Sequence, residues 1–300
     1  MTMVSTSAFY DRTSLSLAAL RGHAERLQGA IASGQRLGPG SDDPVAAAQL
    51  RSLARAESFA AIDTTAASRA ASDLTLTDSA LSAFTDTVIR AKELATQAAN
   101  GVLTTDQRAG IATELGQLHG ELVRLANTRD SAGHALFGGE TAGPAYILDA
   151  SGNPVYAGTA AAGDIALGDG QSVTRGVTGP EVLSFAGTDL FAVLKGLADA
   201  LNGAAADPAQ AARDALGPLD TGLETITTAQ TVVGARLNWI DLTTERRTQL
   251  SEQHAGEQAA LGGTDIAETV TRLQQTMTVL EASQASFAKL AALSLFDLLR

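Results

Sequence analysis

Apolar residues near the N-terminus recur at alternating spacings of three and four. The positions are Leu17, Leu20, Ala24, Leu27 and Ile31. These spacings place the side chains on one stripe of an α-helix, which is typical of a helix that packs lengthwise against another helix. The pattern predicts a first helix whose stripe is an assembly interface.

The C-terminal segment carries the most regular pattern of the chain, with Thr264 or Asp265 placed to cap a final helix. Its predicted interface stripe, with Gln284 as the polar exception, is Ile266, Val270, Leu273, Met277, Leu280, Phe287 and Ala291. Alanine-rich stripes bury little area, and isolated helices are marginal in water. We therefore expect both terminal helices to fold only with a partner.

A strong break separates the first helix from the next. The first helix is predicted to end near Gly34. A second helix is predicted to begin where side-chain oxygens can cap a first turn that contains a proline. The residues of this break and restart are Gly34, Gly38, Pro39, Gly40, Ser41, Asp42, Asp43 and Pro44.

The interior of the chain is predicted to be mainly helical. A long helix should run from about Pro44 to Ala99, and a third helix, capped near Thr104, should run to about Thr128. Helical spacing returns from Leu190 to Leu201 and again from Leu216 to Ile240, and it fades near Gly262 and Gly263.

Between Gly138 and Pro180 the pattern changes to short β-prone pieces separated by Gly, Pro, Asn and Asp. The pieces are residues 145–148, 155–157 and 172–177, and residues 149–153 suit a hairpin turn. The predicted fold is mainly α: an elongated antiparallel rod bundle or coiled coil with a small β-rich insertion.

This pattern predicts three domains. Residues 1–40 and 264–300 should form the terminal helices, disordered in the monomer, and residues 41–137 with 188–263 should form a helical rod. Residues 138–187 should form the β-rich domain.

Composition narrows the class of protein. The formal net charge of -12 and the lack of a basic cluster argue against nucleic acid. The longest apolar stretches are far shorter than the roughly 20 residues that span a membrane, and no cleaved signal peptide is recognised. The absence of cysteine excludes disulfides and thiolate sites, and 4% aromatic residues favour thin helical seams.

No catalytic constellation is visible. The histidines, His23, His119, His134 and His254, are scattered, and no phosphate-binding loop or nucleophile elbow is present. Asp42 and Asp43 suit helix capping better than cation binding, and Gly168-Asp169-Gly170 suits a turn. We expect no enzyme activity, no cofactor and no metal.

Several segments resemble the flagellin-like axial proteins of the bacterial flagellum. They are Met3 to Thr6 with Tyr10, Ala32 to Leu37, Ser41 to Ala48, Asn127 to Gly133, Leu136 to Gly139, Ala282-Ser283 and Leu293 to Phe296. The Ser41-Asp42-Asp43-Pro44 turn is similar to that of the hook-filament junction members of the family, whereas filament flagellins usually lack this proline.

The resemblance implies a structural subunit that forms a ring of copies between hook-associated protein 1 and the flagellin filament. It also implies export by the flagellar type III apparatus without signal cleavage, a chaperone on the C-terminal helix, and terminal helices in the wall of an inner tube. A filament flagellin and an unrelated helical scaffold or binding module remain as alternatives, because heptads alone specify only packing.

Overall fold

The structure is a computed structural model that describes residues 3–36 and 43–298, with side chains described for residues 8–36 and 43–290. Ser41 and Asp42 of the predicted helix restart lie outside these ranges. The chain divides into two compact units, each considered by itself: unit 1 is Met1–Ser58 with Gln249–Arg300, and unit 2 is Phe59–Thr248.

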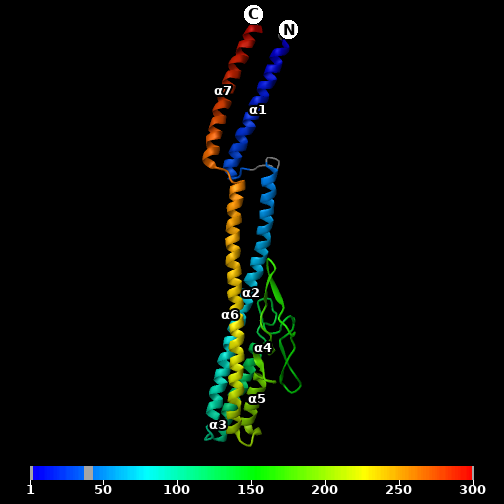
Figure 1. Cartoon of the computed structure of the whole chain (residues 1–300), viewed down its shortest axis with the longest axis vertical. Helices are drawn as coiled ribbons and strands as arrows, with labels where there is room; N and C mark the ends of the chain where they lie inside the picture. The colour runs from blue at the N-terminus through cyan, green and yellow to red at the C-terminus, as the bar shows by residue number, and fades with distance from the viewer. Residues whose placement is uncertain (1–2, 37–42, 299–300) are drawn as a thin grey trace. The chain divides into compact units, whose positions relative to one another are not determined.

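Unit 1 consists of paired helices. Helix α1 (Met3–Ser33) lies beside α7 (Ile266–Leu298), with both ends of the chain at the same end of the pair (Figure 1). The rings of Tyr10 and Phe287 meet edge to face, 5.4 Å apart. The first turns of α2 (Pro44–Ala98) and the last turns of α6 (Pro208–Gly262) form the second pair.

Glu57 joins α2 to α6 within unit 1. Its carboxylate accepts hydrogen bonds from Ser251 Oγ at 2.8 Å and from Gln258 Nε2 at 3.2 Å. These contacts are polar and partly exposed, so the pair in unit 1 has little hydrophobic core of its own.

Unit 2 contains the core of the molecule. Here the long helices α2 and α6 run antiparallel, with Gln230 Nε2 donating to Ser82 Oγ and Lys92 paired with Asp220. Helix α3 (Thr105–Ala126), helix α5 (Leu190–Asp199) and the π-helix η1 (Ala200–Ala204) pack around one end of them (Figure 1). The largest fully buried side chains include Leu74, Leu81, Phe84, Leu115, Leu122, Phe137, Leu190, Phe191, Leu194 and Leu219.

Local sequence explains where α3 begins. Thr104 Oγ1 accepts from Gln107 N–H at 3.3 Å, and Gln107 Oε1 accepts from Thr104 N–H at 2.9 Å, which completes a capping box. The apolar stripe that follows every three or four residues then faces α2 and α5.

The β-rich lobe consists of antiparallel hairpins. Strand β1 (Tyr146–Leu148) pairs with β2 (Pro154–Tyr156), and β3 (Asp164–Gly168) pairs with β4 (Gln171–Thr174). Beyond them, the short helix α4 (Gly179–Leu183) precedes the pair β5 (Ser184–Phe185) and β6 (Thr188–Asp189).

The turn between β1 and β2 is stabilised by one side chain. Asp149 Oδ1 accepts hydrogen bonds from the N–H groups of Ser151 and Asn153, both at 2.8 Å. The strands that flank it lie within one residue of those predicted from the sequence. Strand β3 was not predicted, because its residues are bounded by Gly and Asp and look like a turn until β4 supplies a partner.

Side chains from the helices fix the lobe to the rest of unit 2. Asn127 Oδ1 accepts from Tyr146 N–H at 2.9 Å, and Asn127 Nδ2 donates to Tyr146 O at 3.0 Å. Arg236 Nη1 donates to Gly176 O, and the buried Arg247 donates to Leu167 O. The predicted class of a mainly α protein built from long helices with a small β-rich insertion is confirmed.

Phe84 and Phe59 form a matched pair on α2 that tests where the core lies. Phe84 is 0% exposed and packs 5.2 Å from the ring of Phe137, whereas Phe59 is 67% exposed. We expect Phe84→Ala to lower the free energy of unfolding by about 3–5 kcal/mol, because it leaves a cavity. Phe59→Ala should change it by about 0.5 kcal/mol or less. Urea unfolding followed by circular dichroism measures both, and equal losses would contradict this description of the core.

Candidate assembly surfaces

The stripes predicted to be interfaces lie on α1 and α7. The half-buried members are Leu17, Leu20, Leu27 and Ile31 on α1 and Val270, Leu273 and Phe287 on α7, and Leu280 is buried at 8% exposure. Two members of the stripe on α7 are exposed in the single chain: Ile266 is 56% exposed and Met277 is 44% exposed.

The exposure of these apolar residues follows from the geometry of a two-helix layer. Two helices in contact along one stripe leave the sides of that stripe open to water. Among the described side chains of α1 and α7, only Ala24 and Leu280 are buried. Phe9, Leu15, Val279 and Leu290 are also exposed, with Leu15 at 70%.

The area left uncovered is energetically significant. Complete burial of one such side chain stabilises a structure by roughly 1.5–3 kcal/mol. A neighbour that covered several of them at once would therefore add several kcal/mol to the stability of α1 and α7. This surface is the first candidate site.

The segments that follow α1 and α6 are joined to each other by main-chain hydrogen bonds. We call this short element, formed by Gly34 to Arg36 and Gly262 to Thr264, the clasp. Arg36 N–H donates to Gly262 O at 2.7 Å, and Thr264 N–H donates to Gly34 O at 3.0 Å. Gln35 and Gly263 are opposed as in an antiparallel bridge.

Glycine is required at the clasp for two reasons. Gly34 has a φ of 67°, a left-handed conformation that ends α1. At Gly263, a Cβ atom would come within 2.3 Å of Ala259 O. The sequence predicted helix ends at Gly34 and at Gly262–Gly263, but not that the two ends bond to each other.

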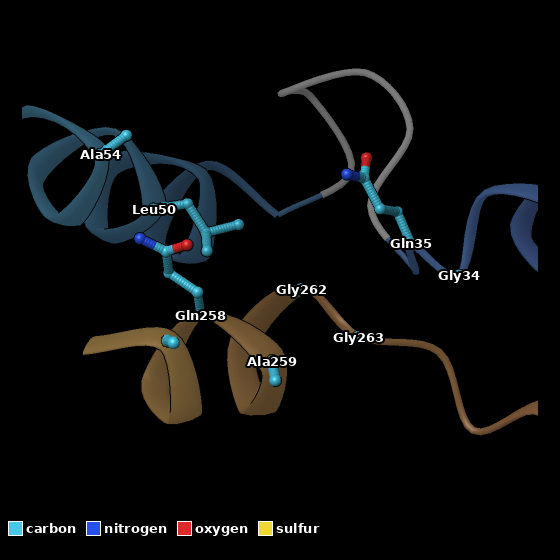
Figure 2. A pocket seen from close by; sticks show the side chains of 9 residues that line it. Gly34, Gln35, Leu50, Ala54, Gln258, Ala259, Gly262 and Gly263 are labelled. Atoms are coloured by element: carbon cyan, nitrogen blue, oxygen red, sulfur yellow. The ribbon is translucent and has the colours of Figure 1, made fainter. Parts of the chain in front are cut away.

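A groove of about 520 Å³ lies beside the clasp in unit 1 (Figure 2). Leu50 on α2 and Gln258 on α6 point toward each other across it (Figure 2). Most of the lining is small, and it consists of Gly34, Gln35, Leu50, Ala54, Ala255, Gln258, Ala259, Gly262 and Gly263. The groove is a consequence of pairing two helices that carry mainly alanine and glycine at this level.

Helices α2 and α7 both begin with an aspartate cap. Asp43 Oδ1 accepts from Ala46 N–H at 3.0 Å, and Asp265 Oδ1 accepts from Glu268 N–H at 3.1 Å. Pro44 is the first residue of α2, where its missing N–H costs nothing. Each helix therefore starts at a sharp, side-chain-capped end next to the clasp.

Arg175 of the β-rich lobe lies near two carboxylates, Asp73 on α2 and Asp130 in the segment that follows α3. Its guanidinium lies 3.4 Å from Asp130 Oδ2 and 3.9 Å from Asp73 Oδ2. Burial, and then the charge of Asp130, raise the pKa of Asp73. Burial also opposes ionisation of Asp130, but the backbone N–H groups of His134 and Ala132 donate to it and hold its pKa below the ordinary value. The arrangement is a structural link.

Neither a metal-binding cluster nor a membrane-spanning helix is found among the described residues. In residues 3–36 and 43–298, no three His, Cys, Asp or Glu side chains are placed to hold a metal ion. Over the same ranges, no helix is both long enough and apolar enough to span a membrane.

Known proteins show the same pattern of sequence and fold. Residues 4–142 match the family described as the bacterial flagellin N-terminal helical region. Flagellar hook-associated protein 3 of Escherichia coli (strain K12) is 28% identical over 288 residues, which cover 89% of this chain and 90% of that protein. The protein of the same name from Salmonella typhimurium is 31% identical over 136 residues, or 45% of this chain and 43% of that protein.

Solved structures share the fold at low sequence identity. A flagellar hook-associated protein from Vibrio parahaemolyticus superposes with a TM-score of 0.70 at 22% identity, covering 74% of this chain and 100% of that chain. The flagellar junction protein from Legionella pneumophila gives 0.61 at 16% identity, covering 72% of this chain and 100% of that chain.

The long helices, the β-rich insertion and the match over residues 4–142 make the chain similar to the flagellin-like structural proteins of the bacterial flagellum. Within that class the chain is similar to flagellar hook-associated protein 3 over most of its length. The family that matches residues 4–142 is one of flagellar structural proteins.

Two glycine substitutions, one in the clasp and one in α6, test the hydrogen bonds of the clasp. Gly263→Ala should disrupt it, because the new Cβ atom would meet Ala259 O, and each backbone hydrogen bond lost costs about 1 kcal/mol. We expect faster hydrogen exchange at the amides of Arg36 and Thr264. In Gly256→Ala, where a Cβ atom meets nothing within 4 Å, these amides should exchange as before while the helix gains about 1 kcal/mol. Unchanged exchange in Gly263→Ala would disprove the role of the clasp.

His119 on α3 makes unit 2 sensitive to acid. Its ring packs 6.0 Å from Phe191, and Nε2 is buried with no hydrogen-bond partner among the described residues. Burial, and then the charge of Lys195, lower the pKa of His119. The unfolded chain therefore binds this proton more readily, so stability is complete above the unfolded pKa of about 6.5 and falls as the pH drops through it.

We expect the His119→Gln variant to lose less stability than the parent chain between about pH 7.5 and about pH 5.5. Urea midpoints at both values measure the difference. His23→Gln, an exposed substitution on α1 outside unit 2, is the matched control for the histidine-to-glutamine change. An equal acid loss in His119→Gln and the parent chain would rule out this group as the cause.

Proposed function

We propose that this protein is the junction subunit that joins the flagellar hook to the filament. In this proposal a ring of copies contacts hook-associated protein 1 on one side and flagellin on the other. The names of its relatives support this assignment, since they are hook-associated protein 3 in two bacteria and a junction protein in a third. The function is structural and involves no cofactor.

The observation that carries the proposal is the uncovered apolar surface of α1 and α7. A monomer that exposes Leu15, Ile266 and Met277 on helices with almost no buried side chains has an incomplete core. Copies of the same helices on neighbouring subunits, together with those of hook-associated protein 1 and flagellin, would complete it. The helices of residues 1–40 and 264–300 would then form the wall of an inner tube.

The same surface supports a route of export. Helices that depend on neighbours are easily unfolded before assembly, and disordered segments gain their structure on binding. We propose that residues 1–40 and 264–300 are disordered in the free subunit and that a dedicated chaperone covers the C-terminal helix. The subunit would pass through the flagellar type III apparatus without signal cleavage and reach the extracellular flagellum.

Unit 2 would remain folded outside the tube. Its buried core needs no neighbour, and its lobe is fixed by the contacts of Asn127, Arg236 and Arg247. We propose the remaining domains as residues 41–137 with 188–263 for the rod and residues 138–187 for the β-rich domain.

A charge placed on the exposed stripe of α7 tests the proposal. Met277→Glu should leave the monomer folded, because the side chain is already half exposed, but it should prevent assembly by forcing a carboxylate into the interface. Gln275→Glu adds the same charge on the opposite side of α7 and should assemble more readily. Electron microscopy of hooks and filaments in strains carrying each variant measures the outcome, with the amount of exported subunit as a control for secretion.

The possible outcomes separate the alternatives. Filaments attached normally in the Met277→Glu strain, at normal export, would refute the assignment of this surface. Long filaments formed by the purified protein alone would favour a filament flagellin. Terminal helices protected from hydrogen exchange in the free monomer would favour an unrelated helical scaffold.

A further inference from the structure

The turn between α2 and α3 carries a reactive dipeptide, Asn100-Gly101. Helix α2 ends at Ala98, and the next residues continue only as a turn in which Asn100 N–H lies 3.4 Å from Gln97 O. Both residues are exposed, and Gly101 has a φ of 68°. Among the described residues, no acceptor is found for the N–H of Gly101.

Two other asparagines have hydrogen-bonded side-chain amides, and a third is followed by a bulky residue. The amide of Asn127 bonds to Tyr146 on both sides, and that of Asn153 donates to Asp149. Asn238 lies inside α6 and is followed by the bulky Trp239. Asn100 has neither a bonded side-chain amide among the described contacts nor a bulky residue after it.

The chain contains an internal comparison for Asn100. Asn202-Gly203 is the same dipeptide and is equally exposed, but Asn202 lies inside η1 and the chain leaves helical backbone only at Gly203, whose φ is 109°. Helical backbone at Asn202 keeps its side-chain carbon away from the nitrogen of the next residue. Asn100 lies past the end of its helix, so its backbone has more freedom to bring these two atoms together.

We propose that Asn100-Gly101 is a site of spontaneous backbone modification that accumulates as the protein ages. The nitrogen of Gly101 forms a bond to Cγ of Asn100, the bond from Cγ to Nδ2 breaks, and ammonia leaves with the proton from Gly101 N–H. Water then adds to one carbonyl of the resulting cyclic imide. Opening on one side gives aspartate, and opening on the other gives isoaspartate, so the reaction consumes water alone and involves no redox change.

Both products alter the end of unit 2. Each replaces a neutral amide by a carboxylate at the C-terminal end of α2, where the helix dipole disfavours negative charge. Isoaspartate also adds one atom to the main chain, next to the residue whose carbonyl, Ala99 O, accepts from Arg213 Nη1 of α6 at 2.9 Å. The modification should therefore loosen the contact between the end of α2 and the start of α6.

Ageing of the purified full-length chain tests the proposal. The protein is incubated at mildly alkaline pH, and peptides are then separated by mass spectrometry and probed with an isoaspartyl methyltransferase. We expect the amide-to-acid conversion at Asn100 to be several-fold faster than at Asn202. Asn100→Gln should remove most of the ammonia released, and Asn202→Gln should remove little.

The stability of the aged protein gives a second measurement. The aged parent chain should show a lower urea midpoint than the fresh chain, and Asn100→Gln should show no such decline. Conversion at Asn202 that equals or exceeds conversion at Asn100 would overturn the proposal, as would the absence of isoaspartate at position 100.

Discussion

Two α-helices packed side by side bury only the stripe along which they touch, and this limit governs unit 1. Alanine-rich stripes make the buried area smaller still, so that Ala24 and Leu280 are the only buried residues among the described side chains of α1 and α7. The rest of the apolar surface must be covered by other molecules or remain in water. In the proposed assembly, neighbouring subunits would cover this surface and complete the core.

Unit 2 shows how the same kind of helix becomes stable without a neighbour. Helices α3 and α5 cover α2 and α6 there, and they bring Phe84, Phe137 and Phe191 into one core. The β-rich lobe contributes Tyr146, whose ring lies 5.0 Å from that of Phe191. The fully buried aromatic side chains among the described residues therefore lie where long helices meet more than one partner.

Much of this architecture could be predicted from periodicity and from helix caps. The start of α2 at Pro44 and the capping of α3 by Thr104 follow from local residue preferences, which need no tertiary information. The strands of the lobe are harder to predict from sequence, because β3 and the pair β5–β6 are short and form only when they pair with each other. Periodicity also placed Met277 on the interface stripe of α7, and in the single chain its side chain is 44% exposed.

The clasp has a consequence for how the terminal helices can change in evolution. Within a continuous helix, inserting or deleting one residue rotates everything that follows by about 100°. The main-chain hydrogen bonds at Gly34 and Gly262 fix the break in the helix. An insertion in a terminal helix therefore does not rotate the helix on the other side of the break. Terminal helices can thus vary in length and sequence to suit different neighbours, while the helices on the other side of each break keep their own faces in phase.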